Sequence, residues 1–139
     1  MIRLPLPAIA AGACVLIAAP AASIADDRTK AVFTAAQADA GRAAYFQHCA
    51  SCHMPDLSGS NDAPPLAGTN FLSAWQARTT RDLFEYVSEA MPPGGAALDA
   101  KTYTAIVAHI LQSNGAKPGG QTLDASTVVS LRELITIAP

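Results

Sequence analysis

Two cysteines and a histidine form the part of this sequence with the clearest chemistry. Cys49 and Cys52 are separated by two residues, and His53 follows directly. Two thiols at this spacing can reach the two vinyl groups of one porphyrin and become thioethers, and the histidine then lies under the iron as an axial ligand. C-x-x-C-H is the sequence of covalent c-type haem attachment. It predicts one haem c, bound through Cys49 and Cys52, with His53 on its iron.

The cysteine pair has three other interpretations: a structural disulfide, a redox pair and part of a zinc site. A structural disulfide between Cys49 and Cys52 is conceivable in an oxidising compartment. A thioredoxin-like redox pair belongs in a βαβ context, and no strand pattern precedes Cys49. A zinc site needs a second pair of ligands, whereas the only other cysteine is Cys14, in the N-terminal segment. The haem interpretation is therefore preferred.

The second axial ligand is sought among the remaining methionines and histidines. Met54 and His48 lie too near the tethered face of the haem to reach its other face. His109 falls on the flank of a predicted helix, where a helix-packing or partly exposed histidine is the simpler interpretation. Met91 follows a predicted helix and precedes a proline turn, so its side chain can reach the far face. Met91 is the predicted ligand, with a core methionine as the alternative.

Three helices are expected to position these residues. The first begins after Thr34, with Gln37 completing a capping-box pattern, and runs to about residue 48. The second spans about 80–90, with Thr79 or Thr80 as its cap, and ends abruptly at a run of prolines and glycines. The third spans about 100–113 and ends at an Asn-Gly pair.

The segments between and after these helices carry less pattern. Residues 54–70 are rich in Pro, Gly, Asp and Asn, which predicts an ordered loop without a helix. Residues 122–139 are amphipathic, and one short helix with an extended end is expected there. The predicted fold class is all-α.

The N-terminal 25 residues have the features of a secretory signal peptide. Arg3 supplies the basic start, an apolar stretch follows, and Ser23 and Ala25 are the small residues that a signal peptidase requires. Residues 4–25 could instead remain as a membrane anchor because they are long enough to span a bilayer. The prolines in this stretch argue against a permanent span. A periplasmic protein is therefore expected, with membrane contact only if the segment is not cleaved.

Removal of residues 1–25 leaves eight basic and eleven acidic residues, a net charge of −3. No basic stripe exists, so nucleic acid is not an expected partner. The expected organisation is a signal peptide at 1–25, a short lead at 26–33, a cytochrome c domain at 34–115, and a tail at 116–139 that packs on the domain or extends it.

Further residues follow a pattern known from one family. They are Gly41-Arg42, Tyr45, Leu57-Ser58-Gly59, the Ala-Pro-Pro-Leu-Ala-Gly run at 63–68, Phe71-Leu72, Trp75, Arg78-Thr79, Leu83, Met91-Pro92, Tyr103 and Ile106 to Leu111. On these residues the chain resembles the class I c-type cytochromes over about 34–115. It looks most like the monohaem cytochromes and fused domains that accompany pyrroloquinoline-quinone-dependent alcohol dehydrogenases. The resemblance implies a cytochrome c fold, with three main helices and long loops around one covalent haem.

The resemblance also implies roles for individual residues. His53 and Met91 match the axial ligands, and Pro64 matches the proline whose carbonyl accepts the Nδ1–H of the haem histidine. Trp75 and Arg78 are candidates for the surroundings of the haem propionates, with a core tryptophan and a solvated arginine as alternatives.

Two more positions are interpreted through the same resemblance. Gly41 and Tyr45 match the crossing of the first helix with the last, facing Ile106. The family often has glycine after the haem histidine, whereas this chain has Met54-Pro55, which leaves the conformation of that loop in doubt.

Histidine–methionine ligation leaves no open iron position, and thioether sulfur raises the reduction potential. Apart from the haem motif, the sequence offers no grouping of carboxylates and histidines that is typical of acid–base catalysis. We therefore expect an outer-sphere electron carrier rather than an enzyme, without a small-molecule substrate. The resemblance implies its redox partners, a quinoprotein-type dehydrogenase as donor and an oxidase or other cytochrome as acceptor. The alternatives are a haem-bearing subunit of a larger oxidoreductase complex and a sensor in which Met91 dissociates.

Overall fold

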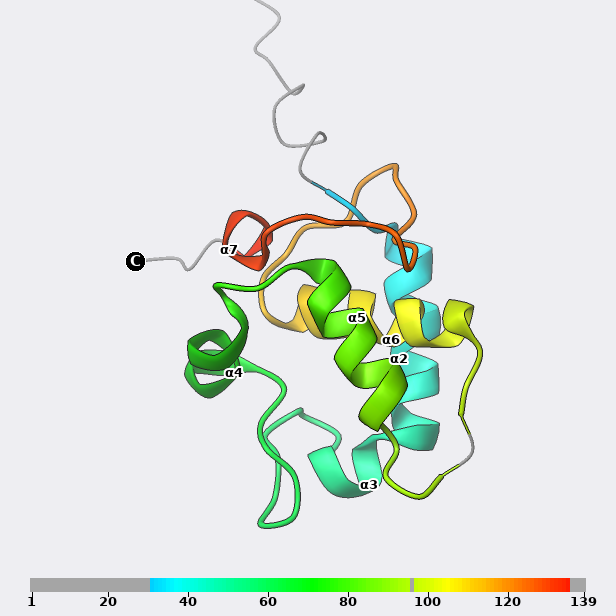
Figure 1. Ribbon diagram of the computed structural model, residues 1–139, viewed down its shortest axis with the longest axis vertical. Coiled ribbons are helices and arrows are strands. Elements are labelled where there is room, and N and C mark those ends of the chain that lie inside the picture. Colours follow the sequence, from blue (N-terminus) through cyan, green and yellow to red (C-terminus); the bar gives the residue numbers. More distant parts are fainter. Residues whose placement is uncertain (1–30, 96, 136–139) are drawn as a thin grey trace, which may run out of the picture.

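The computed structural model describes residues 31–95 and 97–135, so the predicted signal peptide and most of the predicted lead lie outside the described residues. The described part contains helices and no strand, which confirms the predicted all-α class (Figure 1). The helices are α2 (Ala35–His48), α3 (Ala50–His53), α4 (Gly68–Trp75), α5 (Thr80–Ala90), α6 (Ala100–Ser113) and α7 (Leu131–Leu134). No helix in these residues has the length and apolarity that a membrane span requires.

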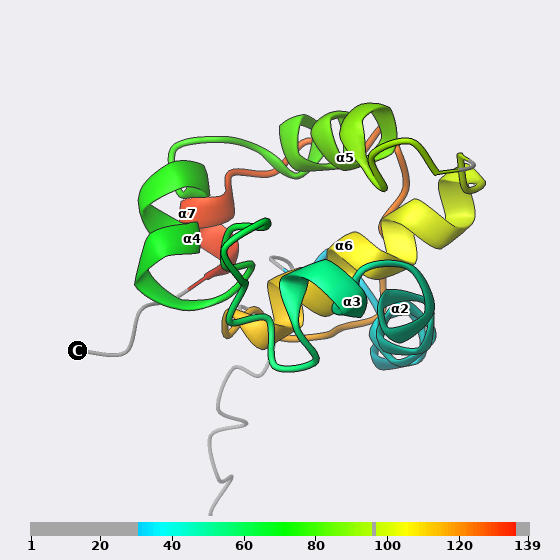
Figure 2. The ribbon, with the colours of Figure 1, turned by 90° about the horizontal axis from the view of Figure 1, so that it is seen from below.

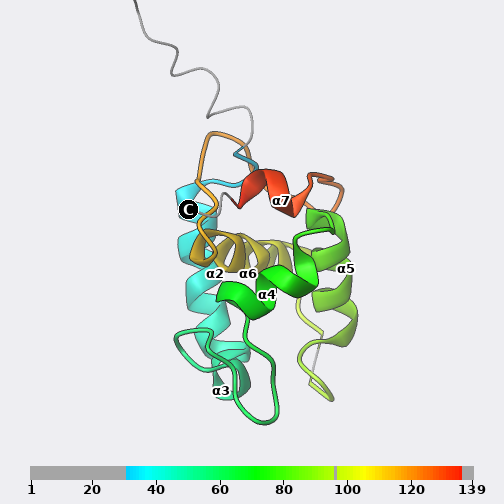
Figure 3. The same ribbon diagram turned by 90° about the vertical axis from the view of Figure 1, so that its left-hand side faces the viewer.

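The helices are arranged on several sides of the molecule. In Figure 2, α5 and α3 lie on opposite sides, and α4 lies at one end. Figure 3 shows α6 passing behind α4, with α2 on one side and α5 on the other. Most of α6 is buried, nine consecutive residues from Tyr103 to Leu111 included. It is therefore the central helix of the fold.

Helices α2 and α6 cross closely at Gly41, as the resemblance implied. A Cβ added to Gly41 would overlap the backbone carbonyl of Ala105 and approach the amide of Ile106. Ala38 and Tyr45, on the same face of α2, are fully buried at this contact. A glycine is needed because only a residue without a side chain lets the two backbones approach this far.

Only one of the two hydrogen bonds of the capping box predicted at the first helix is present. The prediction that the Gln37 side chain bonds back to the start of the helix is wrong. Thr34 does accept a hydrogen bond from the Gln37 amide, at 3.1 Å. The Gln37 side chain, however, binds the backbone of Leu123 in the tail, donating to its carbonyl at 2.7 Å and accepting from its amide at 2.9 Å. A distant backbone segment therefore competes successfully for the side chain. A true capping box occurs instead at α5, between Thr79 and Asp82.

Helix α4 was not expected from the sequence, which predicted a loop through residue 70. No side chain caps its N-terminus, and Gly68 has a positive φ of 79°. The helix has eight residues, too short to be stable by itself in water. Phe71 is buried with 1% of its surface exposed, so tertiary packing stabilises this helix.

The tail packs on the core. Leu123, Leu131, Leu134 and Ile135 belong to the same buried cluster as the residues of α6. The expected short helix is α7, and most of the extended end that was expected after it lies outside the described residues. At the other end of the chain, Phe33 is fully buried and its carbonyl accepts a hydrogen bond from Gly119 at 2.8 Å.

Gly41→Ala is expected to lower the free energy of unfolding by about 1–3 kcal/mol, because the added methyl overlaps backbone that cannot rotate away. This loss outweighs the gain of roughly 1 kcal/mol in helix propensity. Denaturant titration of the haem-loaded protein measures it. Gly120→Ala is the matched control, because no atom lies within 4 Å of an added Cβ there, and it should equal or slightly exceed wild type. Equal stability of the two variants would contradict the close crossing.

His109 is a buried histidine on α6, exposed to 8%. Its ring packs against that of Tyr45, with 5.4 Å between centroids, and its Nε2 has no hydrogen-bond partner among the described residues. Burial, and secondarily the positive charge of Arg42, lower the pKa of His109 below its usual value. The helix-packing interpretation of His109 therefore agrees with its position.

His109 should make the protein less stable in acid. Its proton binds more readily in the unfolded chain, so the free energy of unfolding falls as the pH drops from about 6.5 toward the lower pKa of the folded state. In His109→Phe, which keeps a ring against Tyr45 but does not titrate, the loss of stability between pH 7 and pH 5 should be smaller. Denaturation midpoints at the two pH values measure this, and parallel losses would show that His109 is not responsible.

Candidate functional site

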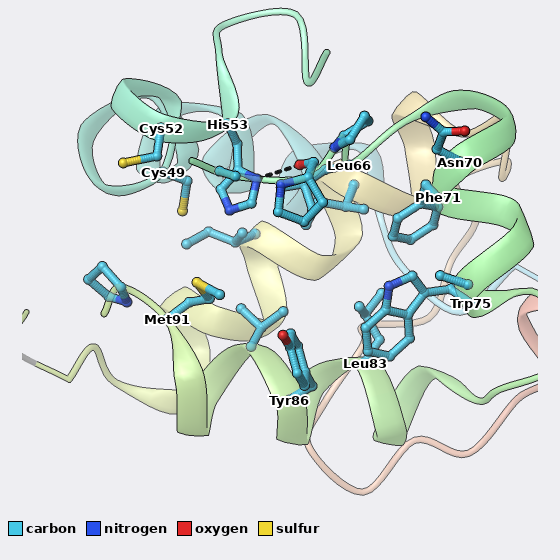
Figure 4. Close-up of a pocket in the computed structure, with 18 of the residues that line it drawn as sticks. Cys49, Cys52, His53, Leu66, Asn70, Phe71, Trp75, Leu83, Tyr86 and Met91 are labelled. Carbon is cyan, nitrogen blue, oxygen red and sulfur yellow. Dashed lines mark hydrogen bonds between the residues drawn. The ribbon is translucent and has the colours of Figure 1, made fainter. Parts of the chain in front are cut away.

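A cavity of about 440 Å³ lies between α3, α4, α5 and α6 (Figure 4). Its volume falls within the range of ligand pockets, about 300–1,000 Å³. Leu83, Val87, Ile106 and Ile110 contribute apolar walls from α5 and α6. All seven residues singled out in the sequence line it, namely Cys49, Cys52, His53, Pro64, Trp75, Arg78 and Met91.

The histidine of the motif is held in one orientation. His53 ends α3 and is buried, with 6% of its surface exposed. Its Nδ1 lies 2.8 Å from the carbonyl oxygen of Pro64, drawn as a dashed line in Figure 4. Because a carbonyl can only accept, Nδ1 must carry the proton. The other ring nitrogen, Nε2, is the one whose lone pair could bind a metal ion.

Met91 approaches the cavity from the opposite side. It follows the last residue of α5, and its amide donates to the carbonyl of Val87 at 3.1 Å. Its own carbonyl accepts from the Tyr103 hydroxyl at 2.7 Å, and that hydroxyl also accepts from the Leu98 amide at 3.2 Å. In Figure 4, the sulfur of Met91 and the ring of His53 lie on opposite sides of the cavity. A nitrogen and a sulfur donor therefore face a common space.

Aromatic side chains and one cation form the end of the cavity near α4. The Arg78 guanidinium lies 5.2 Å from the centroid of the Trp75 ring, within cation–π range. Trp75 stacks on Phe71 at 6.3 Å and meets the edge of Tyr86 at 5.3 Å. The two predicted propionate candidates are thus in contact with each other and line the same cavity.

Three polar side chains at the cavity were not singled out in the sequence. Tyr86 belongs to α5, 52% of its surface is exposed, and its hydroxyl points toward the cavity in Figure 4. Asp62 and Asn70 belong to the segment that was expected to be a loop. Spacing could have found Tyr86, which lies one helical turn from Leu83, but no local signal distinguishes Asp62 or Asn70 from ordinary loop residues.

Residues 36–110 match the family described as cytochrome C oxidase, cbb3-type, subunit III. This match covers more than half of the chain. The chain belongs to this family of class I c-type cytochromes. The cofactor of this cytochrome is haem c, attached covalently through Cys49 and Cys52. The cytochrome c fold implied by the resemblance is thereby confirmed.

Among solved structures, the cytochrome is similar to a chain of the sulfane dehydrogenase SoxCD from Paracoccus pantotrophus. The TM-score is 0.50 and the sequence identity is 25%. The similarity covers 78% of this chain and 59% of that chain, so the cytochrome spans less than two thirds of the matched chain's length. No curated protein sequence matches it significantly.

The cavity of this cytochrome fits a haem. Cys49 and Cys52 are both free thiols and lie together at one edge, where they can form two thioether bonds. Burial, and secondarily Cys52, raise the pKa of the Cys49 thiol, so the unmodified chain carries it protonated at neutral pH. No group of three or more His, Cys, Asp or Glu in the described ranges could hold a separate metal ion. The disulfide and zinc interpretations therefore gain no support.

The unusual Met54 after the haem histidine is accommodated by a strained turn. Its φ is 65°, a region that glycine adopts easily and methionine rarely does. The Tyr45 hydroxyl donates to the Met54 carbonyl at 2.7 Å and holds this turn in place. Burial is the main cause that raises the pKa of Tyr45 to about 12, so its hydroxyl keeps its proton over the physiological range. The Met54 side chain points to solvent, exposed to 38%, and does not line the cavity.

The segment that carries the Pro64 carbonyl is attached to the end of α6. The Asn114 side chain donates to the carbonyls of Leu66 and Ile110, both at 2.9 Å. Its oxygen accepts from the amide of Gly68 at 3.0 Å. Asn114 therefore links the start of α4 and the loop over His53 to the central helix.

Asn114→Ala should lower the free energy of unfolding by about 1–3 kcal/mol, because it leaves the Leu66 carbonyl and the Gly68 amide without their partner. Denaturant titration of the haem-loaded cytochrome measures the loss. Asn61→Ala is the matched control, since Asn61 is an exposed loop residue, and it should change stability by less than about 0.5 kcal/mol. Equal effects of the two substitutions would show that Asn114 does not hold this segment.

Proposed function

We propose that this cytochrome is an exported monohaem electron carrier with His53 and Met91 as the axial ligands of its iron. The single observation that supports this most is the approach of these two side chains to the cavity from opposite sides (Figure 4). One nitrogen and one sulfur donor would then occupy both axial positions. With both positions filled, the iron has no site for a substrate, which suits electron transfer between proteins.

The bound haem would supply a single electron by cycling between ferric and ferrous iron. The protein's part is to keep both ligands in place through that cycle. The Pro64 carbonyl holds the ring of His53 by its Nδ1–H. The hydroxyl of Tyr103 holds the backbone of Met91. These two bonds would keep the ligands rigid around a bound haem, so that little reorganisation would accompany the transfer of an electron.

Sulfur as the second iron ligand would raise the reduction potential. A thioether is a neutral, soft donor that favours ferrous iron and so raises the reduction potential. Surrounding apolar residues have the same effect, because they disfavour the additional positive charge of ferric iron. Val87 and Ile110 are two such residues at the cavity. A carrier of relatively high potential is the result.

The donor that we propose is a periplasmic dehydrogenase, of the quinoprotein type or of another class, and the acceptor is an oxidase or a further cytochrome. The similarity to a chain of the sulfane dehydrogenase SoxCD supports a link with dehydrogenases in general. Export is supported by the signal-peptide pattern of residues 1–25, which also places haem attachment outside the cytoplasm.

A second candidate function is that of a haem-bearing subunit within a larger oxidoreductase complex. The same similarity favours it, because SoxCD is itself an enzyme with a chain of this kind. Purification from a bacterium with its natural partners separates the two functions. A free shuttle elutes alone at its own mass, whereas a subunit remains with its dehydrogenase at physiological salt.

Met91→Ala should lower the reduction potential and open the iron to external ligands. We expect a fall on the order of 0.1 V, within the roughly 0.8 V range over which axial ligands set haem potentials. Spectroelectrochemical titration measures the potential, and carbon monoxide binding measures the open position. Wild-type protein should bind carbon monoxide slowly or weakly, and the variant should bind it readily.

Met54→Ala is the matched control, because Met54 lies next to the haem histidine but its side chain points to solvent. It should keep the wild-type potential and spectrum. Should Met91→Ala instead leave both unchanged, Met91 is not the ligand. Rapid carbon monoxide binding by the wild type would favour a sensor in which Met91 dissociates.

A further inference from the structure

The C-terminal tail contacts the chain at the arginine end of the haem cavity. We call residues 126–131 the tail strap. Leu131 donates its amide to the carbonyl of Arg78 at 3.0 Å. Two residues after Arg78, the amide of Thr80 donates to the carbonyl of Val129 at 2.9 Å. The tail strap itself lies outside the segment 36–110 that matches the family.

The hydroxyl of Thr80 is the centre of this contact. It donates to the carbonyl of Thr127 at 2.7 Å and accepts from the amide of Val129 at 3.1 Å. Thr80 is buried with 1% of its surface exposed, so these bonds are shielded from water. Leu131, at the end of the strap, is fully buried. The strap is therefore fixed to Thr80 through Thr127 and Val129, and it is anchored at its end by the buried side chain of Leu131.

Arg78 is held at its backbone from two sides. Its amide donates to the carbonyl of Trp75 at 2.9 Å, and its carbonyl accepts from Leu131. Its side chain is exposed, and among the described residues its guanidinium lies over the face of Trp75, at 5.2 Å, while its charge is one of the lesser causes that lower the pKa of Asp82. Such a side chain would follow its backbone if the backbone moved. The position of the charge thus depends on the strap.

We propose that the tail strap is a positioning element that keeps the Arg78 guanidinium at the end of the haem cavity and thereby raises the reduction potential. This inference rests on the proposed function, in which the haem occupies that cavity. A nearby positive charge disfavours ferric iron relative to ferrous iron, and the effect weakens as the charge moves into solvent, where water and salt screen it. Loosening the strap should therefore lower the potential.

Thr80→Val tests the proposal, because valine keeps the shape of threonine but lacks the hydroxyl that joins the strap. We expect the ferric-to-ferrous equilibrium to shift toward ferric by about three- to tenfold. At 59 mV per tenfold for one electron, this is a fall of roughly 30–60 mV. Spectroelectrochemical titration of the haem-loaded full-length protein measures it, with the spectrum of the axial ligands unchanged.

Two variants separate this effect from a general loss of stability. Thr80→Ser keeps the hydroxyl and should restore the wild-type potential. Thr104→Val is the matched control, because Thr104 is also buried, at 4% exposure, but its hydroxyl bonds within its own helix to Lys101 at 3.0 Å. It should not change the potential, even if it lowers the denaturation midpoint.

A double-substitution cycle shows whether the strap acts through Arg78. Arg78→Gln alone should lower the potential, and adding Thr80→Val to it should cause no further fall. If the two effects add in full, the strap acts by another route and the proposal is wrong. If Arg78→Gln leaves the potential unchanged in a normally ligated cytochrome, the role proposed for Arg78 fails and the strap inference fails with it.

The remaining outcomes also decide the matter. A folded, haem-loaded Thr80→Val protein with the wild-type potential overturns the inference and leaves the proposed electron carrier intact. If Thr80→Val does not retain haem, Val128→Gly replaces it, because Val128 is an exposed strap residue, at 55%, whose change to glycine loosens the strap and removes no recorded hydrogen bond. A fall in its potential supports the inference, and an unchanged potential overturns it.

Discussion

The close crossing of α2 and α6 at Gly41 is the contact on which the haem site depends. Helix α2 leads directly into the haem motif, so its position decides where Cys49, Cys52 and His53 lie. Helix α6 contributes Ile106 and Ile110 to the cavity wall. A side chain at position 41 would separate the two helices and move the motif away from that wall. Backbone proximity at one glycine thus sets the width of the site.

Helix α6 holds the other parts of the site by hydrogen bonds along its length. Tyr103, near its start, binds the carbonyl of Met91, and Asn114, just after its end, binds the segment that includes Leu66. Met91 and the loop that orients His53 are therefore both anchored to one rigid helix. Such rigidity suits a carrier whose ligands must keep their geometry while the charge on the iron changes.

The two ends of the cavity differ in how they are held. At the thiol end, the two cysteines and His53 lie close together in the sequence, within or next to the short helix α3. At the arginine end, Arg78 precedes helix α5, and its carbonyl accepts a hydrogen bond from Leu131 in the tail. That end therefore depends on residues more than fifty positions apart.

Much of the chemistry followed from the sequence alone. The spacing of Cys49, Cys52 and His53 has one strong chemical interpretation, and the family match supports the haem that it predicts. The three long helices were predicted close to their observed bounds, because their caps, apolar stripes and stopping residues are local signals. The export signal and the methionine ligand remain predictions that only experiment can test.

Tertiary structure alone decided the rest. Helix α4 forms because Phe71 is buried, and not because its sequence favours a helix. The Gln37 side chain binds Leu123, eighty-six positions away, in place of its own helix end. Contacts of this kind depend on which segments folding brings together. A single sequence records the composition of each segment, but not the partner that it will find.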